Sequence, residues 1–141
     1  MKALAYISII VFFFSCKIEP AEIQYNFDQC HFCQMTIVDK SHAAILVTEK
    51  GKSEKFDAIE CKLRHLNREE KIAYAMMLVS DYLSPGTMID ATSAKFVVSK
   101  AIPSPMGAFL SAVPDERTAS EIIDQKGGDA YEWQEVIEKF R

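Results

Sequence analysis

The sequence predicts an α+β fold made of two similar strand-and-helix units of ββαβ-like order. Short apolar, β-branched runs recur along the chain with turn residues between them, as is typical of strands. In each half, such runs are followed by a segment whose apolar residues recur at helical spacing, which indicates an amphipathic helix. The repeated order indicates a duplicated unit, although the two halves share little residue identity.

The first half is expected to contain four strands and one helix. We predict the strands at residues 35–39, 43–49, 53–56 and 72–82, the last of which is also compatible with a helix. Asp57 with Glu60 three residues later resembles a capping box. Apolar residues follow at helical spacing up to Asn67, so the sequence predicts a helix of about ten residues there.

The second half is expected to contain three strands and two helices. We predict strands at residues 87–91, 95–99 and 108–112, a loop at 111–116 and helices at 118–126 and 131–140. Pro103 and Pro105 exclude regular structure between Ile102 and Gly107, because proline lacks the amide hydrogen that helices and strands need. Gly127–Gly128 ends the first of these helices.

The first fifteen residues have the features of an export signal. Lys2 is followed by an apolar stretch from Ala3 to Phe14 and then by Ser15 and Cys16, which is the order of a bacterial lipoprotein signal. The stretch is too short to span a bilayer comfortably. We predict a signal peptide at residues 1–15, a lipidated Cys16, a tether at residues 16–25 and a domain at residues 26–141, with units at about 26–70 and 71–141. A plain secretory signal with an incidental cysteine is the alternative.

Charge and cysteine count restrict the function further. Removal of Lys2 with the signal leaves 15 basic and 20 acidic residues, a net charge of −5, and no basic stripe for nucleic acid. About 125 residues suffice for one compact domain. With Cys16 lipidated, Cys30, Cys33 and Cys61 remain. An odd number in an exported protein leaves at least one thiol free or bound to metal.

The segment Cys30–Met35, with the sequence CHFCQM, is the richest in metal-binding chemistry. Its C-x-x-C spacing lets both sulfurs face one metal ion or form a disulfide. Met35 adds a thioether, which Cu(I) accepts and zinc sites seldom use; in a strand it would share a face with Cys33. Met106, in the stiff proline loop, would complete a Cu(I) site from across the fold. Each methionine has an alternative role in packing of the core.

A zinc site is the competing interpretation. Cys61 and His65 are four residues apart and share the polar face of the predicted helix, opposite its apolar stripe. With Cys30 and Cys33 they make a complete set of zinc ligands, provided that the cysteine loop folds over this face. His31 is a weaker candidate, either an auxiliary copper ligand or a surface imidazole.

Enzymatic chemistry has little support in the sequence. The chain has no H-E-x-x-H motif, no Gly-rich phosphate loop and no Ser-His-Asp signature, and its carboxylates are scattered. A thioredoxin-like C-x-x-C opens a helix after a strand, whereas this one precedes a predicted strand. We therefore expect a protein that is not an enzyme.

Several motifs stand in a specific order along nearly the whole mature chain. They are the lipoprotein cysteine, C-x-x-C-x-M, Phe56–Cys61, Asp81–Tyr82, Asp90–Ala91, Lys95–Val97, Pro105–Gly107, and Gly127–Gly128 before a final aromatic helix. This order resembles the NosL family of nitrous oxide reductase accessory lipoproteins. Gln34 stands where the family often has glycine, a departure that removes no metal ligand.

The resemblance implies a fold related in shape to that of alkylmercury lyase and a Cu(I) metallochaperone for the copper centres of nitrous oxide reductase. It implies Cys33, Met35 and Met106 as copper ligands, with Cys30 as helper. We expect a lipid-anchored protein of the bacterial cell envelope that faces the periplasm. It would pass Cu(I) by ligand exchange to nitrous oxide reductase or to a membrane transport complex beside it. A zinc-stabilised binding module and a thiol-dependent enzyme, either an oxidoreductase or a lyase acting on a metal–carbon bond, are the alternatives.

Overall fold

The computed structural model describes residues 17–69 and 71–141, so the predicted signal peptide and Cys16 lie outside the described residues. Along the chain the elements are β1 (Ala44–Thr48), β2 (Ser53–Phe56), α1 (Ile59–Arg68), β3 (Tyr74–Ser80), β4 (Met88–Asp90), β5 (Lys95–Val98), β6 (Leu110–Val113), α2 (Glu116–Lys126), β7 (Asp129–Tyr131) and α3 (Trp133–Lys139). Within the described ranges, no helix combines the length and the apolar character needed to cross a membrane.

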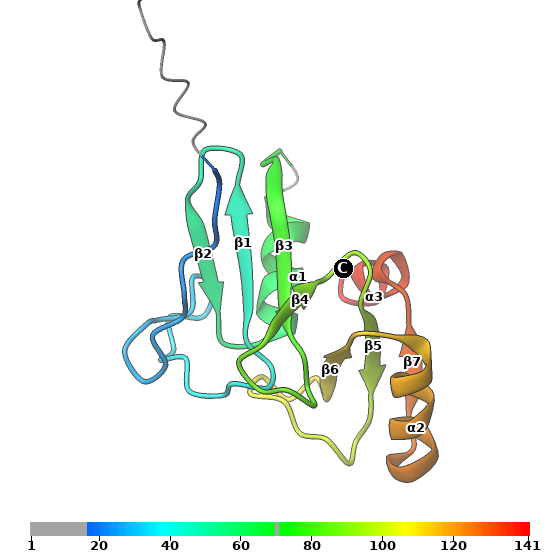
Figure 1. Cartoon of the computed structure of the whole chain (residues 1–141). Helices are drawn as coiled ribbons and strands as arrows, with labels where there is room; N and C mark the ends of the chain where they lie inside the picture. The colour runs from blue at the N-terminus through cyan, green and yellow to red at the C-terminus, as the bar shows by residue number, and fades with distance from the viewer. Residues whose placement is uncertain (1–16, 70) are drawn as a thin grey trace, which may run out of the picture.

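The strands form two antiparallel sheets with the orders β2-β1-β3-β4 and β6-β5-β7 (Figure 1). In each sheet the earliest strand lies between the next two, and a helix connects the second strand to the third. The two units thus repeat one ββαβ topology, which confirms the predicted α+β fold. Because β3 pairs with β1 and with β4, the first sheet extends to Asp90; the division into units near residue 70 stays a prediction.

A shared apolar core holds the units together. It includes Leu46 and Phe56 of the first sheet, Leu63 of α1, and Phe96 and Leu110 of the second sheet, all fully buried. A smaller cluster lies between the second sheet and α2. Burial of large apolar side chains is the main stabilising contribution to such a fold, so neither unit is expected to be stable without the other.

The predicted strand at residues 35–39 is absent. Thr36 forms only an isolated bridge with Gln29, and Met35 is 54% exposed. Gln34 adopts a positive φ of 65° and its N–H donates to the carbonyl of Cys30, so the chain turns just before the apolar run. Because the turn prevents an extended strand, the prediction that Met35 shares a strand face with Cys33 is wrong.

Helix α1 is buried far more completely than its amphipathic pattern predicts. Cys61 and His65, expected on an exposed polar face, are 0% and 8% exposed, and Lys62 is fully buried with its ammonium 4.9 Å from the ring centre of Trp133. The helix contacts β1, β2 and β6, so both units cover it. The predicted capping role of Asp57 is also wrong, because Ala58 occupies the N-cap position without a side-chain hydrogen bond.

Two smaller differences concern the C-terminal part. Helix α2 begins at Glu116, earlier than predicted, because the Asp115 carboxylate caps it by accepting from the Thr118 N–H at 2.8 Å. The three-residue strand β7 was not predicted, and its last residue, Tyr131, was expected to begin a helix; the strand forms because it pairs with β5.

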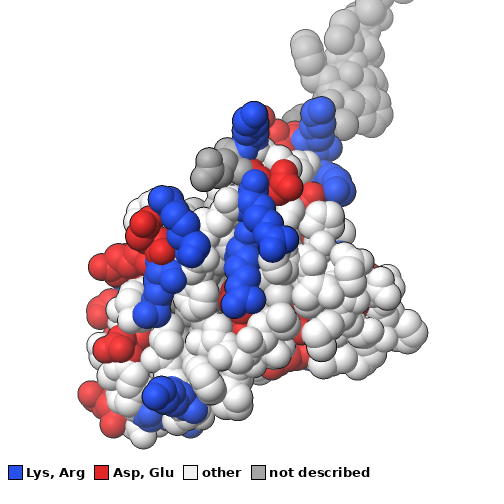
Figure 2. All heavy atoms as spheres, turned by 180° about the vertical axis from the view of Figure 1, so that it is seen from behind, with Lys and Arg blue, Asp and Glu red and all other residues white. Residues whose placement is uncertain are grey.

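Seen from behind, basic side chains stand in separate groups with acidic ones beside them, and part of this face is uncharged (Figure 2).

Candidate metal centre

The cysteine loop and the first turn of α1 bring three thiols together. The Sγ atoms of Cys30, Cys33 and Cys61 all lie within 4.8 Å of one another. All three are free cysteines. Cys30 and Cys61 are fully buried, whereas Cys33 is only partly buried. We call these residues the thiol group; it is closed on the side of the core and reaches the surface through Cys33.

Backbone hydrogen bonds fix the loop that carries two of these thiols. The N–H of Cys30 donates to the carbonyl of Met35 at 2.8 Å, and the N–H of Gln34 donates to the carbonyl of Cys30 at 3.0 Å, which closes a tight turn. The N–H of His31 donates to the carbonyl of Lys55 in β2 at 2.7 Å. The loop is therefore attached to the edge of the first sheet and lies over α1, as a site shared by loop and helix requires.

One negative charge is concentrated on Cys30. The Cys61 S–H donates a hydrogen bond to the Cys30 sulfur, and the backbone N–H groups of Cys33, Asp57 and Phe32 donate to it as well, which together lower the pKa of Cys30 from 9.0 to about 5 despite its burial. The same hydrogen bond and burial raise the pKa of Cys61, and burial raises that of Cys33. These surroundings thus favour the thiolate at Cys30, the residue that the resemblance gives as a helper, over thiolates at Cys33 and Cys61.

The two methionines of the sequence prediction occupy different environments. Met106 is partly buried and packs against the apolar cluster that contains Cys30 and Cys61. Met35 follows directly after the thiol loop and is exposed. Phe27 and Val38, 82% and 57% exposed, lie in the same short segment. The thiol loop therefore presents an unusual concentration of exposed apolar side chains.

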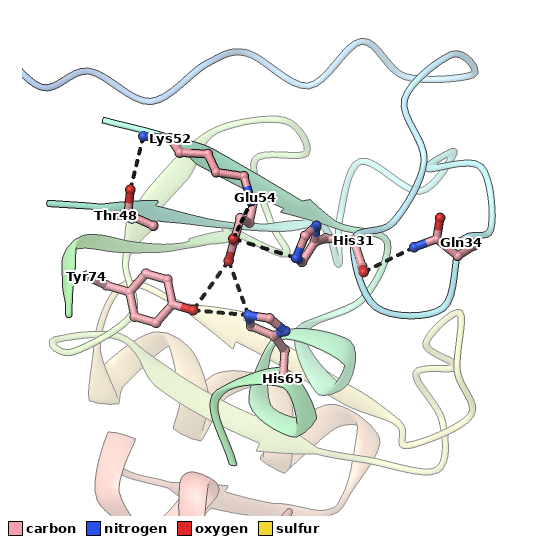
Figure 3. A network of polar contacts seen from close by, with 7 residues as sticks. All are labelled: His31, Gln34, Thr48, Lys52, Glu54, His65 and Tyr74. Carbon is pink, nitrogen blue, oxygen red and sulfur yellow. Dashed lines mark hydrogen bonds and ion pairs between the residues drawn. The ribbon is translucent and has the colours of Figure 1, made fainter. Parts of the chain in front are cut away.

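His31, Glu54 and His65 form a second group of possible metal ligands (Figure 3). One ring nitrogen each of His31 and His65 lies within 4.8 Å of the other and of a Glu54 carboxylate oxygen. The Nε2 atoms of His31 and His65 lie 3.6 and 3.2 Å from the Glu54 oxygens, and both rings point toward the carboxylate. We call these residues the imidazole–carboxylate group. Its nitrogen and oxygen donors suit a borderline divalent ion such as Zn(II).

The surroundings of Glu54 keep it ionised. Burial raises its pKa, but the Lys52 ammonium at 3.0 Å and the nearby imidazoles outweigh burial, so the pKa lies below its ordinary value. Burial lowers the pKa of His65, which favours the neutral imidazole that a metal ion requires. The hydroxyl of Tyr74 donates to Glu54 at 3.3 Å, and burial raises the pKa of Tyr74 to about 12.

The structure divides the predicted zinc ligands between the two groups. Cys61 lies with Cys30 and Cys33, whereas His65, one turn further along α1, lies with His31 and Glu54. The cysteine loop does fold over α1, as the zinc interpretation requires. However, Cys30 and Cys33 approach Cys61, whereas His31 approaches His65. Sequence reasoning missed Glu54, because a glutamate that alternates with other residues in a strand has the pattern of a solvent-facing side chain.

A third polar cluster has the connectivity of a hydrolase triad. His42 Nδ1 lies 2.8 Å from Asp39 Oδ2, and His42 Nε2 lies 3.1 Å from the hydroxyl of Ser111. Ser111 is fully buried in β6 and His42 is 3% exposed, so no substrate reaches the hydroxyl. These hydrogen bonds therefore join the second sheet to the loop before β1 and have no nucleophilic function.

The fold and the thiol group define a class: small α+β proteins with a sulfur-rich site suited to a soft metal ion. The chain belongs to the NosL family, whose family model matches residues 20–140. It is similar to the copper-binding lipoprotein NosL of Stutzerimonas stutzeri, at 30% identity over 128 residues that cover 85% of this chain and 67% of the relative. The crystal structure of the copper chaperone NosL from Shewanella denitrificans has a similar fold, with a TM-score of 0.71 and 23% identity over 82% of this chain and 93% of the other. Both relatives are described as copper proteins rather than enzymes, in agreement with the non-enzymatic prediction.

Proposed function

We propose that this protein is a lipid-anchored Cu(I) chaperone of the bacterial cell envelope, facing the periplasm, that delivers copper for the assembly of nitrous oxide reductase. The observation that supports it most is the convergence of three thiols within 4.8 Å, one of them at the surface. Thiolate and thioether ligands select Cu(I) over hard cations. The family and the described character of its members support copper as the cargo.

The geometry favours transfer by ligand exchange. A buried thiolate at Cys30 holds the ion from the core side, while the partly exposed Cys33 and the exposed Met35 lie where an acceptor ligand can approach. An incoming thiolate or thioether replaces one ligand at a time, so copper is never released to solvent. Met106, which packs against the apolar cluster that includes Cys30 and Cys61, supplies a neutral thioether from the second unit.

Competition with metal chelators tests the choice of ion. The reduced mature protein is expected to bind about one Cu(I) and to hold it against a Cu(I) chelator that removes copper from weaker sites, because soft ligands favour the softer ion. Zn(II) should be lost from the thiol group to a moderate zinc chelator. A tight zinc site that requires Cys61, with weak copper binding, would favour a zinc-stabilised binding module instead.

The imidazole–carboxylate group supports a second binding function, that of holding a divalent ion such as Zn(II). Zinc titration of Cu(I)-loaded protein isolates this group, because copper then occupies the thiols. Glu54→Gln should weaken zinc binding about 10- to 100-fold, since the amide is a neutral and poorer ligand. Glu49→Gln, at an exposed glutamate in the turn of the same hairpin, is the matched control and should leave zinc affinity unchanged.

The anchor and the acceptor have separate tests. Cys16→Ala should release the protein into the soluble periplasmic fraction or stall its processing, because it removes the lipid attachment point. Normal cleavage with continued membrane association would contradict the anchor.

For the acceptor, Cu(I)-loaded protein should transfer copper to nitrous oxide reductase that lacks copper, or to a membrane transport complex that assembles it, and failure with both would remove this destination.

A further inference from the structure

The turn that carries Met106 is closed by its own backbone. Gly107 donates its N–H to the carbonyl of Ser104 at 2.9 Å. On either side of this turn, the N–H of Ser99 donates to the carbonyl of Phe109 at 3.0 Å. Gly107 has a φ of 73°, which glycine adopts without strain. These contacts define the shape of the turn, but they do not determine where it lies relative to the cysteines of the other unit.

A single carboxylate oxygen provides that connection. Glu60 Oε1 accepts the Ser104 hydroxyl at 2.6 Å and the N–H of Ala108 at 3.4 Å. Ser104 and Ala108 flank Met106 on both sides, so Glu60 holds both ends of the turn. Glu60 is also the neighbour of Cys61 in the first turn of α1. The same helical turn therefore carries one thiol and the anchor of the methionine loop.

Glu60 is a costly choice for a residue that only packs. Its side chain is fully buried, with 0% of its surface accessible to solvent. Its second oxygen, Oε2, has no hydrogen-bond partner among the described residues. A buried carboxylate loses hydration that two hydrogen bonds restore only in part. An apolar pair of similar volume would serve stability as well or better, so the polar pair calls for a functional explanation.

We propose that Glu60 is a positioning residue, which, through Ser104 and Ala108, fixes Met106 toward the thiol group and thereby sets the affinity for Cu(I). This inference rests on the proposed function, because it assigns Met106 to the copper site. Glu60 does not touch the metal ion. It couples the methionine of the second unit to the cysteines of the first, so the fourth sulfur reaches the thiols only while the hydrogen bond is intact.

A double-mutant cycle tests this coupling. Ser104→Ala removes the hydroxyl with little change in volume and should lower Cu(I) affinity by about three- to tenfold, the effect of one hydrogen bond. In a Met106→Leu background the same change should have no further effect on affinity, because the ligand that it positions is already lost. Ser99→Ala is the matched control, since this buried serine bonds the carbonyl of Lys126 instead, and it should leave copper affinity unchanged.

Two further measurements separate positioning from folding and charge. In the metal-free protein, the methyl NMR signal of Met106 should shift or broaden in Ser104→Ala and not in Ser99→Ala. Glu60→Gln keeps the accepting oxygen and should retain Cu(I) affinity within about threefold of wild type. An equal loss in Glu60→Gln would assign the effect to charge and overturn the positioning role.

The outcomes distinguish this inference from the proposed function. Weakened copper binding in Met106→Leu together with unchanged binding in Ser104→Ala would overturn the role of Glu60 and leave the chaperone proposal intact. Independent, additive losses in the double variant would also overturn it. If Met106→Leu itself has no effect, Met106 is not a ligand and the shared site fails, whatever the NMR signal of the turn shows.

Discussion

The thiol group and the imidazole–carboxylate group both draw on the cysteine loop and α1, and the second group adds Glu54 of β2, yet their chemistry differs. Cys30 and His31 are consecutive in one loop, and Cys61 and His65 are one turn apart in α1, but each pair is divided between the groups. The thiol group offers soft sulfur ligands, and the other offers nitrogen and oxygen. Alternation of residue type within a loop and a helix therefore lets one small contact region present two donor sets that select different ions.

The two groups also neutralise charge differently. The thiolate at Cys30 is stabilised by a thiol and by backbone N–H groups, so binding of a cation meets no competing positive side chain among these donors. The Glu54 carboxylate already has the Lys52 ammonium at 3.0 Å. A cation must displace Lys52 or share the carboxylate with it. The thiol group can therefore bind a monovalent cation without displacing a positive side chain, whereas a cation that binds the imidazole–carboxylate group competes with Lys52 for Glu54.

Loss of a single thiol should produce the largest difference between the groups. Cys33→Ser is expected to abolish high-affinity Cu(I) binding, a loss of more than about 100-fold, because a hydroxyl is a poor ligand for a soft ion. His65→Ala removes a ligand of the other group and should leave Cu(I) affinity within about threefold of wild type. Anaerobic competition against a Cu(I) chelator measures both. Equal losses in the two variants would mean that the groups act as one site.

The second prediction concerns the shared proton of the thiol group. Cys61→Ala removes the S–H donor that lowers the pKa of Cys30 most, so this pKa should rise from about 5 toward 9.0. Ultraviolet absorbance of the thiolate, followed against pH in the reduced metal-free protein, measures it. In wild type, unfolding between about pH 5 and pH 9 takes up a proton, so the contribution of Cys30 to stability rises with pH over this window. The rise of stability with pH should be smaller in Cys61→Ala than in wild type. An unchanged pKa of Cys30 in this variant would contradict the hydrogen bond from Cys61.

Elements with a strong local pattern were predictable from sequence, and elements that depend on pairing were not. Strand β1 and helix α1 were predicted because apolar spacing records burial directly. Strand β7 has little apolar character and is extended only because β5 lies beside it. Residues 35–39 have the composition of a strand, but the positive φ at Gln34 turns the chain before them. Local composition does not record such a turn.

The site was predictable to a similar extent. The spacing of Cys30 and Cys33 identified them as a pair without any tertiary information. Cys61 was recognised as a possible ligand, but its separation from His65 depends on where the loop lies over α1. Glu54 carried no signal, because its role arises only from the side chains that face it. The sequence thus identifies the types of ligand, whereas the fold determines which ligands lie together.

The third prediction tests whether the thiol group extends into the second unit. Met106→Leu keeps volume and hydrophobicity nearly constant and should cost less than about 1.5 kcal/mol in free energy of unfolding. It deletes the thioether, so Cu(I) affinity should fall by about tenfold. Met77→Leu, at another partly buried methionine that packs on the core, is the matched control and should leave affinity unchanged. Unaltered affinity and transfer in Met106→Leu would restrict the site to the first unit.

The smallest expected effect comes from the competing ammonium of the imidazole–carboxylate group. Lys52 is 64% exposed in its side chain and pairs at 3.0 Å with the buried Glu54, and the exposure of the ammonium keeps the contribution of this pair to about 1 kcal/mol. Lys52→Met retains the apolar stem and frees the carboxylate oxygen, so zinc affinity of the Cu(I)-loaded protein should rise by about two- to fivefold. Copper affinity should not change, because Lys52 does not belong to the thiol group. Lys50→Met, at an exposed lysine of the same hairpin, controls for net charge. An equal rise in both variants would show that general electrostatic attraction, rather than the Lys52–Glu54 contact, sets zinc binding.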